Sequence, residues 1–299
     1  MRRPLSSTVA LVLLAAGALA ACSDDDPVTT ATTTATGDTD GDEAAAGGNE
    51  CTAGNTLADG VLTIATDTPA FPPWFIDDDP TSGEGFESAV AYAVAEELGY
   101  GNEQVEWVVA AFNSVIAPGE KPFDFAINQV SISEERDQAV DFSDGYYDVN
   151  QAIVGFADSE AAGATTVADL QGLRLGAQVG TTSLDFITEV IEPAEEPFVY
   201  NDNASAKAAL DAGQVDGIVL DLPTAFFVSA VEIEGTAVIG QFPSTGDEPE
   251  QFGMVFDEGN PLRDCVNEAL AAVEERGDLD AIEQQWLSDT VDAPVIDIE

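Results

Sequence analysis

Short apolar runs and amphipathic segments alternate along most of the chain. Residues 61–66, 105–109 and 125–128 are apolar runs typical of strands, and apolar residues from 86 to 98 recur at i, i+3, i+4 and i+7, which predicts a helix that stops at Gly99. Later strands are expected at 173–177, 198–200, 217–220 and 251–256, and later helices at 182–191, 204–212, 261–276 and 279–287, with another from Pro223. This alternation predicts an α/β fold.

The first 50 residues differ from the rest of the chain. Two arginines at positions 2 and 3, an apolar run at 9–19 and the sequence Leu19-Ala20-Ala21-Cys22 have the form of a lipoprotein signal peptide, residues 1–21, with Cys22 as the lipidated N-terminus. A transmembrane anchor is the alternative, but the run is shorter than the ~20 residues of a spanning helix. Residues 22–50 are rich in Asp, Thr, Ala and Gly and predict a disordered acidic tether. We therefore expect an exported protein, anchored by lipid to the outer face of the cell membrane.

Acidic residues far outnumber basic residues. The sequence has 57 Asp and Glu against 8 Lys and Arg, a formal net charge of −49. This charge excludes nucleic acid as a partner and favours solubility or adaptation to high salt, with steering of cationic solutes as the alternative. The chain has no histidine, which excludes Ser-His-Asp and Cys-His catalysis and the usual zinc sites. We expect no cofactor, no metal and no enzymatic activity.

Arg136 lies beside a polar turn that follows the apolar strand at 125–128. Ser133 has the position of an N-cap, and ligands of α/β proteins bind where such strands end. A guanidinium meets a carboxylate bidentately, and the Ser131 hydroxyl can add a hydrogen bond. The pattern therefore predicts a carboxylate receptor. The alternative is a solvated ion pair of Arg136 with Glu135, Asp137 or Asp141.

The motifs around Arg136 occur in a characteristic order. They are Ser131, Ser133 and Arg136, then Val140 to Ser143 and Tyr146-Tyr147, together with Thr66-Asp67, Phe71 to Trp74, Gly85 to Glu87, Gln178 to Ser183, Asp216 to Asp221 and Trp286-Leu287. Over about Leu57 to Leu287 the chain resembles the family-3 extracellular solute-binding proteins, the amino-acid-binding components of ABC importers.

The resemblance implies a two-lobe, type II periplasmic-binding-protein clamp in which each lobe is a mixed sheet flanked by helices. The first lobe would comprise 51–149 and 251–299, and the second 150–250, with crossover strands near 148–153 and 241–251 as the hinge. The implied partners are a free amino acid, expected to be polar, and an ABC permease in the membrane, and the implied state is a monomer. Alternatives are a dehydratase or lyase on the same fold, or a sensor that serves no transporter.

The resemblance also assigns roles in the site. Arg136 and Ser131 would hold the α-carboxylate from the first lobe, Thr181 and Thr182 would donate from the second, and Asp221 would take the α-ammonium. Thr181, Thr182 and Asp221 have an alternative role as helix caps. Phe71 and Phe112 would form an aromatic wall or belong to the core, and the residues that would face the ligand side chain are Asp67, Asn113, Asn128, Gln129, Tyr147 and Gln151. The amides at 128 and 129 depart from the small residues common in the family.

Two cysteines remain once Cys22 is assigned to the lipid. Cys51 and Cys265 lie in parts that the family brings together in its first lobe, and an extracytoplasmic setting favours a disulfide between them. Two free buried thiols are the alternative.

Overall fold

The computed structural model describes residues 47–244, 249–287 and 293–298. The expected signal peptide, the lipidation site and nearly all of the tether lie outside the described residues. Within the described part, no helix is both long enough and apolar enough to cross a membrane.

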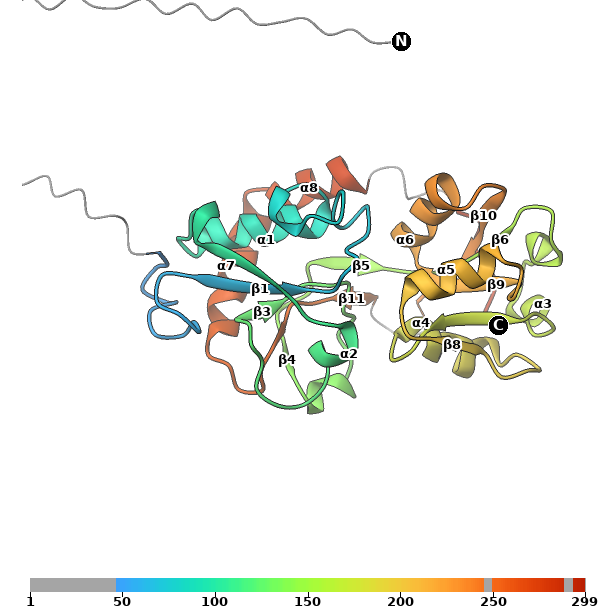
Figure 1. Cartoon of the computed structure of the whole chain (residues 1–299), viewed down its shortest axis with the longest axis horizontal. Helices are drawn as coiled ribbons and strands as arrows, with labels where there is room; N and C mark the ends of the chain where they lie inside the picture. Colours follow the sequence, from blue (N-terminus) through green and yellow to red (C-terminus); the bar gives the residue numbers. More distant parts are fainter. Residues whose placement is uncertain (1–46, 245–248, 288–292, 299) are drawn as a thin grey trace, which may run out of the picture. The chain divides into compact units, whose positions relative to one another are not determined.

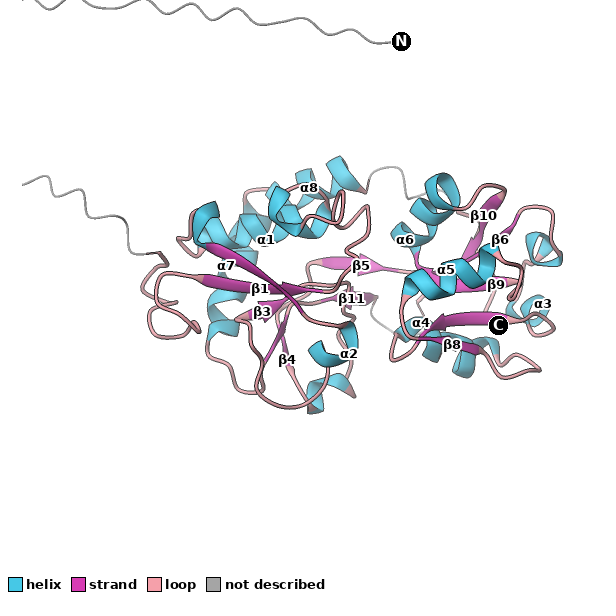
Figure 2. Cartoon of the chain, in the orientation of Figure 1, coloured by secondary structure: helices cyan, strands magenta, loops and turns pink. Residues whose placement is uncertain are grey.

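The first lobe is built on a five-stranded mixed sheet. Its order is β2 (Val105–Val109), β1 (Leu62–Thr66), β3 (Phe125–Ala126), β12 (Val255–Phe256) and β4 (Asp141–Phe142), with β1 parallel to β2 and β3 and β12 antiparallel to β3 and β4. The helices of this lobe are α1 (Phe86–Glu97), α2 (Phe112–Val115), α7 (Leu262–Glu275) and α8 (Asp278–Trp286). Figure 2 shows α1 and α8 above strands β1 and β3 in this view.

Strand β1 is buried along its whole length because helices cover both of its faces. Leu62 and Ile64 pack in the apolar cluster that contains α1 and α7, whereas Ala65 packs in the cluster that contains Phe112 of α2. The continuous apolar run that predicted this strand therefore reflects burial on two faces.

The second lobe has its own five-stranded sheet. The order is β10 (Thr236–Gln241), β6 (Gln151–Phe156), β9 (Gly217–Asp221), β7 (Leu175–Gln178) and β8 (Phe198–Tyr200), with β7 parallel to its two neighbours and β6 antiparallel to its own. The helices are α3 (Val167–Leu170), α4 (Thr182–Phe186), α5 (Asn203–Asp211) and α6 (Leu222–Phe227). Along β6, Ile153 packs in one apolar layer and Ala152 and Val154 in the other. The fold is therefore the expected α/β arrangement, with a separate sheet and core in each lobe (Figure 1).

The crossovers fall where the sequence predicted them. Strand β5 (Tyr147–Val149) pairs antiparallel with β11 (Glu250–Phe252). One residue, Asn150, separates β5 from β6 of the second sheet. Strand β10 of the second sheet precedes β11 along the chain, so the paired strands β5 and β11 carry the chain from one lobe to the other.

The C-terminal segment corrects the assignment of 251–299 to the first lobe. Ile296 is fully buried in the second lobe's core, and Gln241 of β10 exchanges backbone hydrogen bonds with this segment at Pro294 (2.7 Å) and Ile296 (2.9 Å). Asp297 pairs with the chain at residues 165–167. Residues 293–298 therefore belong to the second lobe, whereas α8 before them belongs to the first.

The folded body also begins earlier than residue 51. The N–H of Gly48 donates to the carbonyl of Gly99 (3.0 Å), and the amide of Asn49 donates to the carbonyl of Glu97 (3.4 Å). Residues 47–50, assigned to the tether from their composition, are thus attached to the end of α1.

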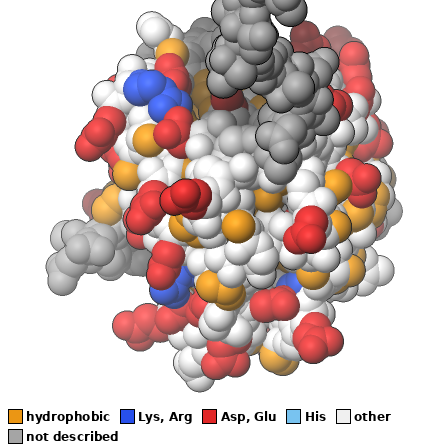
Figure 3. Space-filling view, turned by 90° about the vertical axis from the view of Figure 1, so that its left-hand side faces the viewer, with side chains coloured by type: hydrophobic (Ala, Val, Ile, Leu, Met, Phe, Trp, Pro, Cys, Tyr) orange, Lys and Arg blue, Asp and Glu red, His pale blue; other side chains and the backbone are white. Residues whose placement is uncertain are grey.

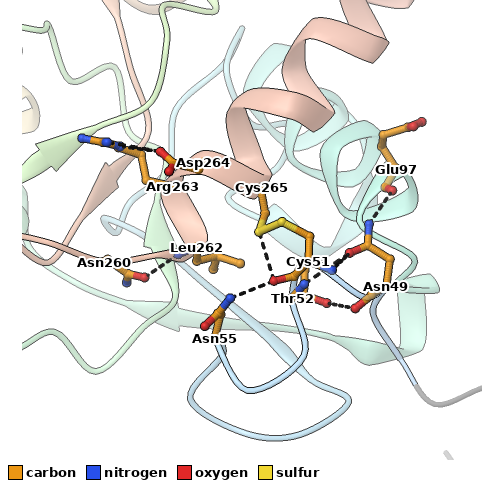
Figure 4. Close-up of a disulfide and its surroundings, with 10 residues drawn as sticks. All are labelled: Asn49, Cys51, Thr52, Asn55, Glu97, Asn260, Leu262, Arg263, Asp264 and Cys265. Atoms are coloured by element: carbon orange, nitrogen blue, oxygen red, sulfur yellow. Dashed lines mark hydrogen bonds and ion pairs between the residues drawn. A yellow bond between two sulfur atoms is a disulfide. The ribbon is translucent and has the colours of Figure 1, made fainter.

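The structure contains a disulfide between Cys51 and Cys265, whose Cα atoms are 5.8 Å apart (Figure 4). Cys265 lies on α7, and Asn49 and Asn55 form hydrogen bonds on either side of Cys51. Since both cysteines lie in the first lobe, the bond joins the start of the folded body to helix α7 without crossing the hinge.

Two predicted helices are shorter or different in form. The helix expected at 182–191 is α-helical as α4 and continues as a single wide turn from Ile187 to Ile191. After Ser133 the chain forms only a short 3₁₀ turn, Arg136–Gln138, although the Ser133 hydroxyl accepts from the Arg136 N–H (3.2 Å) as an N-cap does. The amphipathic pattern predicts burial but not the pitch of the last turns.

Candidate functional site

A cleft lies between the two lobes. Eleven of the thirteen residues predicted to bind or face the ligand line it, and the lining residues are Asp67, Thr68, Pro69, Ala70, Phe71, Phe75, Phe112, Asn128, Gln129, Ser131, Arg136, Gln151, Gln178, Thr181, Thr182, Ser183, Asp202, Asn203, Leu220, Asp221 and Phe252. Tyr147 does not line it and instead packs against Trp74, Phe86 and Phe252.

Arg136 and Lys121 are the basic residues of the described chain without an ion pair, and Lys121 lies outside the cleft, where it donates to the carbonyls of Ser114 and Ala117. Arg174, Lys207, Arg263 and Arg276 all form ion pairs with carboxylates, whereas the described residues place no carboxylate in an ion pair with Arg136. Its guanidinium donates to the carbonyls of Ser131 (2.6 Å) and Gly180 (2.9 Å), one in each lobe. The expected alternative, a surface ion pair, does not occur.

The surroundings of Arg136 keep its guanidinium available to a ligand. The side chain is buried, and burial lowers the pKa of its guanidinium, while nearby Asp185 and Glu250 oppose that shift. A guanidinium remains charged in proteins. The Arg136 Cζ lies 5.6 Å from the centre of the Phe112 ring, which covers it from the first lobe. With two N–H groups committed to carbonyls, the others remain for an anion.

The hydroxyls predicted to contact the ligand carboxylate have a protein partner. Ser131 Oγ (2.5 Å) and Thr182 Oγ1 (2.7 Å) both donate to the carboxylate of Glu250, which also accepts from the Gln151 amide (3.0 Å). Thr181 caps α4 by accepting from the Leu184 N–H. Glu250 lies on the crossover strand β11 and joins a residue of the first lobe to two of the second.

Asp221 has both of the roles considered from the sequence. It caps α6 by accepting from the Thr224 N–H (2.8 Å), and it lines the cleft at the end of β9. Burial raises its pKa from 3.8 to about 6. The site therefore offers a desolvated carboxylate in the lobe opposite Arg136, which favours a cationic partner.

Two more carboxylates line the cleft. Asp67 accepts from the N–H groups of Thr68 (2.7 Å) and Phe112 (3.1 Å), which fixes it at the end of β1. Asp202 caps α5 through the Ser205 N–H (2.7 Å). Within the described residues, no group of three or more Cys, Asp or Glu side chains has the arrangement of a metal site.

Direct contacts hold the lobes together around the cleft. The indole N–H of Trp74 donates to Thr224 Oγ1 across the lobes (2.8 Å). The ammonium of Lys207 on α5 lies 3.5 Å from the centre of the Phe71 ring and is paired with Glu232. Phe71 is thus part of the cleft wall and of the contact between lobes, rather than plain core.

Gly180 is required where the lobes meet. Its φ of +74° favours glycine, and a Cβ there would lie 2.5 Å from Asn113 Oδ1. Asn113 was predicted to face the ligand, but it does not line the cleft and instead packs against Gly180.

Several cleft residues had no role from the sequence. Gln178 and Ser183 belong to the loop already noted for its motif, and Asp202 could have been found as an N-cap before α5. No local sequence pattern marks Glu250 as a residue of the site, because its position depends on how β11 crosses between the lobes.

Comparisons with known proteins agree with this architecture. The model of the bacterial extracellular solute-binding proteins, family 3, matches residues 62–289. The chain belongs to this family. The L-cystine-binding protein TcyJ of Escherichia coli (strain K12) is 28% identical over 222 residues, covering 72% of this chain and 79% of that protein. The arginine-binding extracellular protein ArtP of Bacillus subtilis (strain 168) is 28% identical over 213 residues, covering 68% and 78%.

A solved structure shows the same fold. An ancestral arginine-binding protein bound to arginine superimposes with a TM-score of 0.64 at 29% identity, covering 76% of this chain and 98% of that one. The type II clamp inferred from the motifs is therefore confirmed, and the family is one of extracellular binding proteins.

Proposed function

We propose that this solute-binding protein captures an amino acid with a cationic side chain between its lobes and delivers it to an ABC permease. The observation that carries this proposal is the meeting, in one cleft, of a guanidinium without an ion-pair partner in the described chain and a desolvated carboxylate from the opposite lobe. An α-amino acid presents the complementary pair of charges a few ångströms apart.

In this proposal Arg136 binds the α-carboxylate bidentately, and Asp221 binds the α-ammonium. Backbone N–H groups next to Ser131 and Thr182 complete the carboxylate subsite, because the hydroxyls of both residues already donate to Glu250. Each end of the zwitterion is thus bound by a different lobe, so the ligand favours the closed clamp over the open one.

The charge of the cleft supports a cationic side chain. Three carboxylates line it against one guanidinium. Once Arg136 and Asp221 have paired with the zwitterion, Asp67 and Asp202 remain to neutralise a cation. Phe71 and Phe112 offer apolar faces to its alkyl stem.

The remaining parts of the proposal concern location and delivery. Lipid attached to Cys22 would tether the protein outside the membrane, where its acidic surface keeps it soluble; acidic side chains are spread over the face in Figure 3 rather than gathered in one patch. The family relationship supports binding without turnover, and closure would create the surface that the permease recognises.

A thermal-shift panel tests the proposal. The protein used begins at residue 22 and carries the substitution Cys22→Ser. It is unfolded and refolded to remove carried-over ligand, and is then heated with each proteinogenic amino acid at moderate and high salt. Ligand at ~100 Kd adds about 2.7 kcal/mol to stability. We expect L-arginine or L-lysine to raise the melting temperature most. Absence of any rise from folded protein would overturn the amino-acid assignment.

A further inference from the structure

Gln129 occupies an unusual place in the cleft. It lines the site where small residues are common in the family, and its backbone has a φ of +48°. Residues other than glycine adopt this conformation only when their surroundings hold them there. Contacts with neighbouring residues must therefore hold the Gln129 backbone in this conformation.

Glu87 holds Gln129 from behind. The Gln129 N–H donates to Glu87 Oε1 (2.6 Å), and the side-chain amide nitrogen of Gln129 donates to Glu87 Oε2. The hydroxyl of Tyr146 is the third donor to the same carboxylate. Glu87 itself is fully buried in the first turn of α1, where a helix N-terminus favours a carboxylate.

This arrangement fixes the direction of the Gln129 amide. An ionised carboxylate can only accept hydrogen bonds, so the amide nitrogen must point toward Glu87. The amide is planar, so its carbonyl oxygen points elsewhere, and among the described residues no donor reaches that oxygen. Gln129 therefore retains its acceptor for a molecule in the cleft.

We propose that Glu87 is a positioning residue that makes Gln129 present its carbonyl oxygen to the ligand side chain, and so selects side chains that carry N–H donors. Ammonium and guanidinium groups fit this acceptor, whereas an apolar side chain leaves it without a partner. The inference rests on the proposed function, because it assigns a selectivity to the same cleft.

Proton uptake by Glu87 gives the inference a distinctive signature. Burial, with a smaller contribution from nearby Asp221, raises the pKa of Glu87 from 4.5 to about 7, although the hydrogen bonds from Tyr146 and Gln129 oppose this shift. Tyr146 stays protonated, because burial and Glu87 raise its pKa well above 10. Once Glu87 is protonated it also becomes a donor, so it no longer dictates which half of the amide faces the ligand.

The test compares L-lysine with L-norleucine, which has the same carbon chain without the ε-ammonium. Calorimetry at pH 8 gives the ratio of the two Kd values for the wild type, Glu87→Gln, Gln129→Ala and the double variant. We expect each single variant to reduce the preference for lysine about ten- to a hundredfold, the value of one hydrogen bond to a charged donor. The double variant should reduce it no further, since Glu87 acts through Gln129.

The pH dependence of the ratio separates positioning from structural support. In the wild type the preference for lysine should decline from pH 8 to pH 5.5, and in both single variants it should stay level. Asp221 also titrates in this range, but it binds the α-ammonium of both ligands and cancels from the ratio. Each variant is compared with the wild type by thermal unfolding.

Two results would overturn the inference while leaving the proposed function intact. One is an unchanged lysine preference in Glu87→Gln, and the other is an equal loss of affinity for both ligands. If the refolded wild type bound no amino acid in the panel, the proposed function itself would fail, and the inference with it.

Discussion

Arg136 brings a guanidinium, with two N–H groups bonded to the carbonyls of Ser131 and Gly180, into a cleft that three carboxylates also line. Its scarcity among acids and its position after a buried strand predicted a carboxylate receptor, and in the structure it lines the cleft without an ion pair to any described carboxylate. The partners of Ser131 and Thr182 were not predictable, since Glu250 reaches them from the crossover strand β11. Motifs identify the residue types at a site, but they do not show which of the hydrogen-bond donors are already bonded to another residue of the protein.

Replacement of Arg136 by alanine tests the carboxylate subsite. We expect Arg136→Ala to weaken amino-acid binding at least tenfold, because it removes a charged bidentate donor. Arg174→Ala is the matched control: this exposed arginine pairs with Asp216 away from the cleft and should leave affinity unchanged. Equal affinities of wild type and Arg136→Ala in a calorimetric titration would refute the assignment.

Asp221→Asn separates ligand binding from helix capping. Asparagine caps helices as well as aspartate does, so the fold should survive. Loss of the charge should weaken binding of the amino acid about tenfold or more, whereas an analogue without the α-amino group should bind wild type and variant alike. A parallel loss for both ligands would show that Asp221 acts only as a cap.

At the scale of elements, the periodicity of the sequence located most strands and helices, but it did not show which lobe the C-terminal segment packs against. β1, α1, β9 and α7 lie within one or two residues of their predicted bounds. The segment at 293–298 was placed in the wrong lobe, because a short apolar stretch such as Val295-Ile296 predicts burial without naming the sheet that buries it. Long-range pairing is not encoded in a local pattern.

That segment gives a prediction about stability. Ile296 is fully buried against the second lobe, so Ile296→Ala should lower the free energy of unfolding by about 2–5 kcal/mol. Val295, its neighbour, is 64% exposed, and Val295→Ala should cost no more than about 0.5 kcal/mol. Urea unfolding of the two variants measures the difference. Similar values for both would mean that the segment is not part of the second core.

At the scale of the whole molecule, acidity and buried carboxylates set the response to pH. Burial raises the pKa of Glu87 from 4.5 to about 7 and that of Asp221 from 3.8 to about 6. At a pH between the unfolded and the folded pKa of each group, the folded chain holds a proton that the unfolded chain has released. The free energy of unfolding therefore increases as pH falls through each of these ranges.

We expect the free energy of unfolding to be higher at pH 5 than at pH 8 at constant high salt. The gain from each group is at most about 3 kcal/mol. Glu87→Gln should remove the contribution of Glu87, so that the free energy of unfolding changes less with pH. Repulsion among the surface carboxylates is the same in both proteins and does not affect the comparison. A wild type that is less stable at pH 5, or a variant with the same profile, would contradict these pKa shifts.

The most direct measurement is a crystal structure of the protein with the amino acid that gives the largest thermal shift. The proposed function predicts the ligand's α-carboxylate on the Arg136 guanidinium, its α-ammonium on Asp221, and its side chain directed toward Asp67 and Gln129. A ligand bound elsewhere, or one whose carboxylate does not contact Arg136, would contradict the proposed site.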